Sequence, residues 1–217
     1  MERKQRIHAP IRYGRLSAKN TDSPSYTMVF ARSCARPRRR LGTAWAVPFR
    51  TPTDGEEELR VEASELARAE TNRATYSQLS NDWFTVGIIV NPHSPMRRDI
   101  QKWWGRVYGQ IRDDHDLRRI HLKSEGSIIT RDGCVRVSWP DIVESGGTLD
   151  YDYLLATPTV PEISGGRYPT VRQIASSWAR NDEYFRRNID SFITTAQDRE
   201  LQKHLERGRS VGGITEV

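Results

Sequence analysis

The sequence has few of the features that mark membrane-spanning or secreted proteins. Its longest apolar stretch, Phe84 to Val90, is interrupted by Thr85 and Gly87 and is far shorter than the roughly 20 residues that cross a bilayer. The amino terminus is charged, and no apolar segment follows it as in a secretory signal. We therefore expect a soluble, cytoplasmic protein without membrane contacts.

Cysteine and recognisable catalytic motifs are also scarce. The two cysteines, Cys34 and Cys134, are far apart and lack CxxC spacing, which fits neither a disulfide framework nor a zinc site. There is no GxSxG or HExxH motif, and the paired glycines lack the strand-before, helix-after context of a dinucleotide-binding loop. The sequence thus indicates no cofactor or metal and leaves open whether the protein is an enzyme.

Lysine is rare, whereas arginine is abundant and clustered. Only five of the 34 basic residues are lysines. Guanidinium groups suit phosphates and carboxylates, but a GC-rich genome would also favour arginine, and the bias continues through the acidic part of the chain. Residues 1–53 contain 12 basic and two acidic residues, a net charge of +10, while residues 54–217 have a net charge of −4. The net positive charge is therefore N-terminal.

Apolar and β-branched runs predict several strands. The strands at 26–30 and 43–47 should pair as a hairpin around a basic loop, and the strand at 83–90 should be central in a sheet. Asp132–Gly133 should form the turn between the strands at 127–130 and 134–137. The expected strands are residues 26–30, 43–47, 83–90, 127–130, 134–137 and 149–156.

Capping residues and helical periodicity predict helices at 54–70 and 94–111, and a helical C-terminal quarter from about residue 170. The second C-terminal helix is expected to carry Phe192 and Ile193, and Asp198 is expected to open the third. The whole pattern predicts a basic arm over residues 1–25 and a single α+β domain over 26–217. Its sheet should be mixed or mainly antiparallel, with about five or six strands and helices packed on it.

The basic loop is the main candidate for a binding site. Arginine side chains that neutralise phosphates supply sequence-independent affinity for nucleic acid. The nearby rings of Tyr13, Tyr26 and Trp45 could either stack on unpaired bases or fill the core. The arginines could instead pair with the protein's own glutamates at 56–58. The candidate nucleic-acid-binding residues are Arg32, Arg36, Arg38, Arg39, Arg40 and Arg50.

A second candidate lies where the strand at 83–90 meets the helix that begins at Ser94. The carboxyl end of a strand and the amino end of a helix both favour anions. A plainer interpretation is that Asn91 and Pro92 shape the turn, Ser94 caps the helix and His93 is solvated. The candidate anion-binding residues are Asn91, His93, Ser94, Arg97 and Arg98.

Two acidic clusters admit both a functional and a structural explanation. The run Asp113–Asp116 with His121 offers metal ligands, but such a run is more often a solvated helix end. Asp150 and Asp152 would share one face of a strand, as paired catalytic carboxylates do, although the polar face of a strand explains them equally.

The sequence therefore predicts a nucleic-acid-binding protein, of the kind that could serve as a subunit of a nucleoprotein assembly. It does not distinguish DNA from RNA. Two alternatives remain open at this stage. One is a small enzyme or ligand-binding protein for an anionic metabolite at Asn91–Ser94, and the other is a subunit that docks on acidic proteins.

Overall fold

The computed structural model is a mixed α+β structure. In the residues that it describes, five helices and three small antiparallel sheets are present, and no helix is long and apolar enough to cross a membrane. The described residues are 4–17, 24–31, 34, 41–49, 53–71, 78–81, 83–114, 128–130, 132–159, 161, 167–178 and 182–212.

The six strands pair in a way that differs from the prediction. The expected hairpin of residues 26–30 and 43–47 is not formed, because each of these strands pairs with a strand from the first 17 residues, where we had expected an irregular arm. The antiparallel pairs are β1 (Gln5–Ala9) with β4 (Gly42–Ala46), β2 (Ile11–Ser17) with β3 (Ser25–Phe30), and β5 (Gly87–Val90) with β6 (Tyr153–Ala156). In the described residues these pairs form three two-stranded sheets rather than one sheet of five or six strands.

Neither Pro10 nor Gly14, residue types that often interrupt strands, prevents strand formation in the N-terminal part of the chain. Pro10 lies between β1 and β2 and interrupts neither of them, and Gly14 lies within β2, where the register with β3 shifts. Ile7, Ala9 and Tyr13 are all buried. The first 17 residues thus contribute to the core.

The helices follow the prediction closely, with small shifts at their ends. The capping box of Thr170 and Gln173 forms as expected, with the Thr170 amide donating to Gln173 Oε1 (2.8 Å) and the Gln173 amide donating to Thr170 Oγ1 (3.3 Å). The helix expected from Ser94 begins at Arg97. The helices are α1 (Glu56–Thr71), α2 (Arg97–Asp114), α4 (Val171–Trp178), α5 (Asp182–Asp190) and α6 (Asp198–Gly212).

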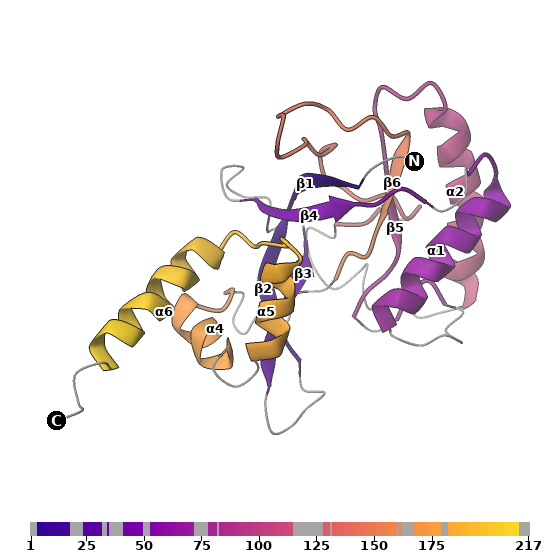
Figure 1. Cartoon of the computed structure of the whole chain (residues 1–217). Coiled ribbons are helices and arrows are strands. Elements are labelled where there is room, and N and C mark those ends of the chain that lie inside the picture. The colour runs from indigo at the N-terminus through magenta and orange to yellow at the C-terminus, as the bar shows by residue number, and fades with distance from the viewer. Residues whose placement is uncertain are drawn as a thin grey trace.

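The main core joins β5, β6, α1 and α2 at one end of the molecule (Figure 1). Ile88 is fully buried, and its strand pairs with β6 on one side while its amide and carbonyl bond to Gly133 and Val135 on the other. The strand expected to be central is thus contacted on both sides, but beyond β6 its second neighbour among the described residues is a single isolated bridge to Cys134 rather than another strand. Gly133 has a φ of +76° in the turn, and a Cβ there would lie 2.5 Å from the Tyr108 ring.

A second core holds the C-terminal helices against the β2–β3 pair at the other end (Figure 1). Tyr13 of β2 contacts Phe185 of α5 with ring centroids 5.4 Å apart. Trp178 of α4 stacks on the same Phe185 ring at 4.7 Å. Leu201 of α6 is fully buried in this cluster, so all three C-terminal helices are fixed to the N-terminal strands.

Candidate nucleic-acid interface

The six arginines predicted to bind nucleic acid all lie outside the described residues. Five of them belong to residues 32–40, here called the Arg-rich segment, and the sixth is Arg50. The structure does describe Cys34 within this segment and Gly42 just after it. These two residues define where the segment is anchored.

The Cys34 end is anchored beside the start of α4. Cys34 is buried, with 1% of its surface exposed, and its Sγ lies 3.3 Å from the hydroxyl of Tyr168, three residues before α4. The guanidinium of Arg12 lies over the Tyr168 ring, 4.6 Å from its centroid. A cation on an aromatic face therefore stands beside this anchor.

The Gly42 end is anchored just after α5. Thr43 and Thr194 exchange backbone hydrogen bonds of 2.9 and 3.1 Å, and a Cβ at Gly42 would lie well inside van der Waals contact with the Thr194 carbonyl oxygen. Trp45 donates from Nε1 to the Ser191 carbonyl (2.6 Å). The Lys4 ammonium lies 4.5 Å from the centroid of the Trp45 ring, so a cation on an aromatic ring stands at this anchor too.

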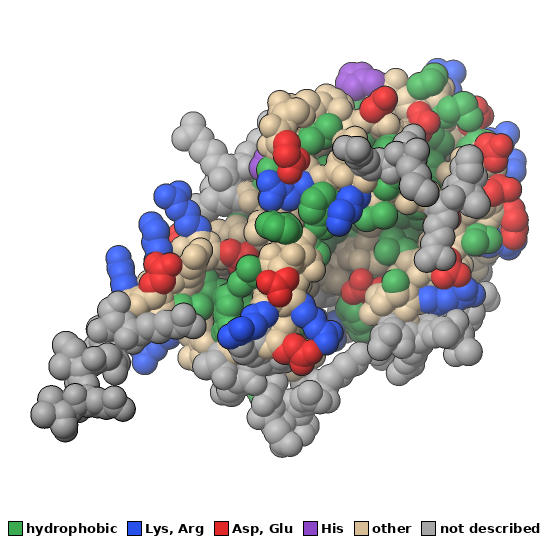
Figure 2. Space-filling model, in the orientation of Figure 1, with side chains coloured by type: hydrophobic (Ala, Val, Ile, Leu, Met, Phe, Trp, Pro, Cys, Tyr) green, Lys and Arg blue, Asp and Glu red, His purple; other side chains and the backbone are tan. Residues whose placement is uncertain are grey.

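Both anchors lie beside β2, since Arg12 of this strand contacts Tyr168 and the neighbouring Ile11 carbonyl accepts a hydrogen bond from the Ala196 amide (3.4 Å), two residues after Thr194. The next helix, α6, carries three exposed cations at helical spacings of four residues, Arg199, Lys203 and Arg207. Figure 2 shows Lys and Arg side chains along this helix. Two exposed glutamates, Glu200 and Glu206, lie on the same helix.

Of the aromatic residues considered for base stacking, the structure places two in the core. Tyr13 is 2% exposed, and Tyr26 is half-buried against the C-terminal helices. Trp45 is also half-buried, but the Lys4 ammonium lies over its ring. Sequence reasoning missed the Arg12–Tyr168 and Lys4–Trp45 pairs, because the partners are separated by many residues. The spacing of the α6 cations could have been noticed.

The Asn91–Ser94 junction satisfies its own polar groups. Asn91 donates from Nδ2 to the Tyr151 carbonyl (2.8 Å) and accepts from the His93 amide (2.9 Å). Ser94 accepts from the Met96 amide (3.0 Å), and its hydroxyl donates to Asp152 Oδ1 (2.5 Å). The protein's own carboxylate therefore stands beside the helix start, where an anionic ligand was expected. His93, Arg97 and Arg98 are exposed.

Within the described residues, the other candidate groups form no arrangement suited to chemistry. His115, Asp116 and His121 lie outside the described residues, and within those described no group of three His, Cys, Asp or Glu residues could hold a metal. Asp150 and Asp152 precede β6 instead of sharing a face of it. Burial and the nearby Asp132 carboxylate raise the pKa of Cys134 to about 11, so this thiol is protonated at neutral pH and is a poor nucleophile.

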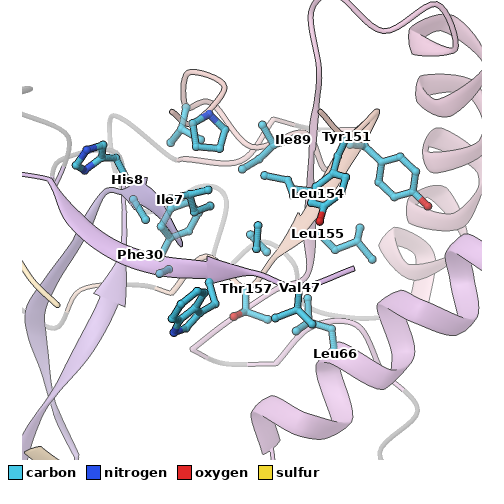
Figure 3. A pocket seen from close by; sticks show the side chains of 18 of the residues that line it. Ile7, His8, Phe30, Val47, Leu66, Ile89, Tyr151, Leu154, Leu155 and Thr157 are labelled. Atoms are coloured by element: carbon cyan, nitrogen blue, oxygen red, sulfur yellow. The ribbon is translucent and has the colours of Figure 1, made fainter. Parts of the chain in front are cut away.

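A pocket of about 1170 Å³ lies between the β1–β4 pair and the β5–β6 pair. Figure 3 shows Phe30, Val47, Leu154 and Leu155 around it, with Leu66 of α1 at one side. Its polar lining includes Lys4, His8, Asp150 and Thr157. This pocket was not predicted, because its walls are built by strands that lie far apart in the chain, β1 and β4 on one side and β5 and β6 on the other.

Comparisons with known proteins place this chain in no family. No protein-family model, no curated protein and no solved structure matches it significantly. Its function must therefore be inferred from its own residues and their arrangement.

Proposed function

We propose that this protein binds nucleic acid through the Arg-rich segment and the cationic side chains beside its two anchors. The observation that carries the proposal is the double anchoring of this segment, at Cys34 beside Tyr168 and at Gly42 beside Thr194. A polyanion that follows the segment would meet Arg12 at one anchor and Lys4 at the other. Each phosphate neutralised would release counterions and add to the affinity.

The local balance of charge supports this proposal. The described part of residues 4–49 contains the cations Lys4, Arg6, Arg12 and Arg15 and no Asp or Glu. Arg6 forms an ion pair with Glu144 at 2.9 Å, whereas Lys4 and Arg12 lie on aromatic faces. Cations held on rings keep most of their charge available to phosphates, and rings beside cations also suit the bases of nucleic acid.

A salt titration with matched variants tests the proposal. Replacing Arg36, Arg38, Arg39 and Arg40 by alanine removes up to four phosphate contacts. The slope of log affinity against log salt should then become shallower by about 3 units, because each contact contributes roughly 0.7 to 0.9. Fluorescence anisotropy with labelled oligonucleotides measures the slope.

The control removes the same charge at the other end of the molecule. Arg60, Arg68, Lys102 and Arg106 belong to α1 and α2, and three of them pair with glutamates. Alanine at these four positions should leave the slope nearly unchanged. Equal loss of slope in both variants would mean that only net charge matters, and an unchanged slope in the Arg-rich variant would contradict the proposal.

The pocket favours a second function, the binding of a small molecule with an apolar body. Its volume of about 1170 Å³ is comparable to ligand pockets, which usually occupy roughly 300–1,000 Å³. Half-buried Leu154 and Leu155 would lose their remaining exposure against such a ligand. Leu155→Trp should abolish the fluorescence enhancement of a bound anilinonaphthalene dye, while Leu155→Met should retain it. Equal enhancement in both variants would argue against a ligand site here.

A further inference from the structure

Phe192 is an aromatic residue in an unfavourable place. Its φ is +55°, in the left-handed region that residues with a Cβ seldom adopt. Its side chain is 59% exposed. It is the only residue other than glycine with a positive φ in the part of the chain that the structure describes. Neither the backbone nor burial therefore accounts for a phenyl ring at this position.

The positive φ follows from the way α5 ends. The Phe192 amide donates to the Ile189 carbonyl (2.9 Å), and the Ile193 amide donates to the Asn188 carbonyl (3.0 Å). These two bonds form the Schellman motif, in which the residue at the Phe192 position is usually glycine. Glycine would end the helix in the same way without strain, so the fold itself does not require the ring. The helix was predicted to continue through Phe192, and this motif is why it stops at Asp190.

The backbone around Phe192 is nevertheless firmly held against β4. Thr43 donates from Oγ1 to the Phe192 carbonyl (3.1 Å), and Trp45 donates from Nε1 to the Ser191 carbonyl (2.6 Å). Thr194 pairs with Thr43 through two backbone bonds. The exposed ring is thus presented from a fixed backbone at the Gly42 anchor, where the Arg-rich segment ends.

The surroundings of Phe192 combine apolar surface with cations. Ile189, one helical turn earlier, is 51% exposed. The Trp45 indole donates to the carbonyl of Ser191, the residue before Phe192, and the Lys4 ammonium lies over the Trp45 ring. Exposed aromatic rings beside cations are the usual means of binding single strands, since every base has a face on which a ring can stack.

We propose that Phe192 is a stacking platform for an unpaired base of a single-stranded nucleic acid. The inference rests on the proposed function, because the Arg-rich segment supplies the contacts to phosphate. It goes further in naming the substrate class: bases in a duplex are stacked on each other and leave no free face for the ring. Single-stranded DNA and RNA share this chemistry.

The test uses Phe192→Gly, for which stability and binding should change in opposite directions. Relief of the left-handed strain should raise the Tm by about 2–4 °C. Loss of the ring should weaken binding to single-stranded DNA or RNA oligonucleotides by roughly 5- to 100-fold, with an unchanged salt slope. Phe192→Trp should keep the affinity, and Phe192→Leu should weaken binding although it keeps an apolar side chain. Parallel titrations of DNA, RNA and a duplex identify the strand that is bound.

Two failures can be told apart in this experiment. If Phe192→Gly binds single strands as tightly as the wild type and with the same salt slope, the stacking platform is wrong and the proposed function stands. If the wild type shows no salt-dependent binding to any oligonucleotide, the proposed function fails and the inference with it. An equal loss of affinity for duplex and single strand would also overturn the assignment of single strands.

Discussion

The surroundings of Glu70, in the last turn of α1, change the pKa of its carboxyl group. It accepts a hydrogen bond from Thr157 Oγ1 (3.2 Å). Burial raises the pKa of its carboxyl group, an effect that the Thr157 bond opposes. Because the raised pKa belongs to the folded state, the charged carboxylate lowers stability at neutral pH, and this cost disappears as the pH falls through the raised pKa.

Glu70→Gln should therefore stabilise the protein at pH 7. The amide oxygen can still accept from Thr157, and no charge is buried. The advantage over the wild type should shrink as the pH is lowered toward 4.5, the ordinary value for glutamate, since the wild-type carboxylate becomes protonated. Urea unfolding at several pH values measures the difference.

Glu65→Gln is the matched control on the same helix. Glu65 is exposed and pairs with Arg68 at 2.5 Å, an exposed pair worth about 0.2–1 kcal/mol. This variant should be neutral or slightly destabilising at pH 7. A destabilised Glu70→Gln would show that the carboxylate makes a favourable contact that outweighs its burial.

At the scale of elements, the contact between β4 and the link from α5 to α6 joins the two ends of the chain. Gly42 allows the close approach of this link, because any Cβ would collide with the Thr194 carbonyl. The collision involves backbone on both sides, so a flexible side chain cannot relieve it. The backbone at Phe192 is held by this contact, since Thr43 donates to the Phe192 carbonyl (3.1 Å).

Gly42→Ala should accordingly destabilise the protein by about 1–3 kcal/mol and weaken oligonucleotide binding. Gly105→Ala is the opposite case, since a Cβ there meets nothing within 4 Å and alanine favours a helix interior by up to about 1 kcal/mol. Thermal unfolding of both variants measures the two effects. A neutral Gly42→Ala would mean that the link can move away from β4 at little cost.

How far the sequence predicts these elements depends on how local their determinants are. The capping box at Thr170 lies within four residues and was correctly predicted, as was the turn at Gly133. Strand pairing is decided by partners far apart in the chain, so β3 and β4 looked like a hairpin although each pairs with an earlier strand. The candidate site shows the same division. The arginines were visible in the sequence, whereas Tyr168, Thr194 and Phe192 acquire their roles only through contacts made in the fold.

At the scale of the whole molecule, the basic N-terminal part and the C-terminal helices belong together. The strands β2 and β3 pack against α4, α5 and α6, and β4, which follows the Arg-rich segment in the chain, bonds to the link between α5 and α6. The acidic first turn of α1, Glu56 to Glu58, lies at the other end of the molecule (Figure 1). Glu56 and Glu57 form ion pairs there with Arg106 and Arg60, respectively. These pairs reduce the competition between the glutamates and phosphates for the arginines of the Arg-rich segment.

Nucleic acid should contact the part of the surface defined by the two anchors of the Arg-rich segment. Ultraviolet crosslinking to an oligonucleotide, followed by cleavage at acidic residues and mass spectrometry, locates this contact on the chain. No acid lies between Asp22 and Asp54, so this cleavage keeps the Arg-rich segment, both anchors and Trp45 in one peptide. We predict crosslinks in that peptide and in residues 191–197, which contain Phe192. Crosslinks confined to peptides of α1 and α2 would contradict the account.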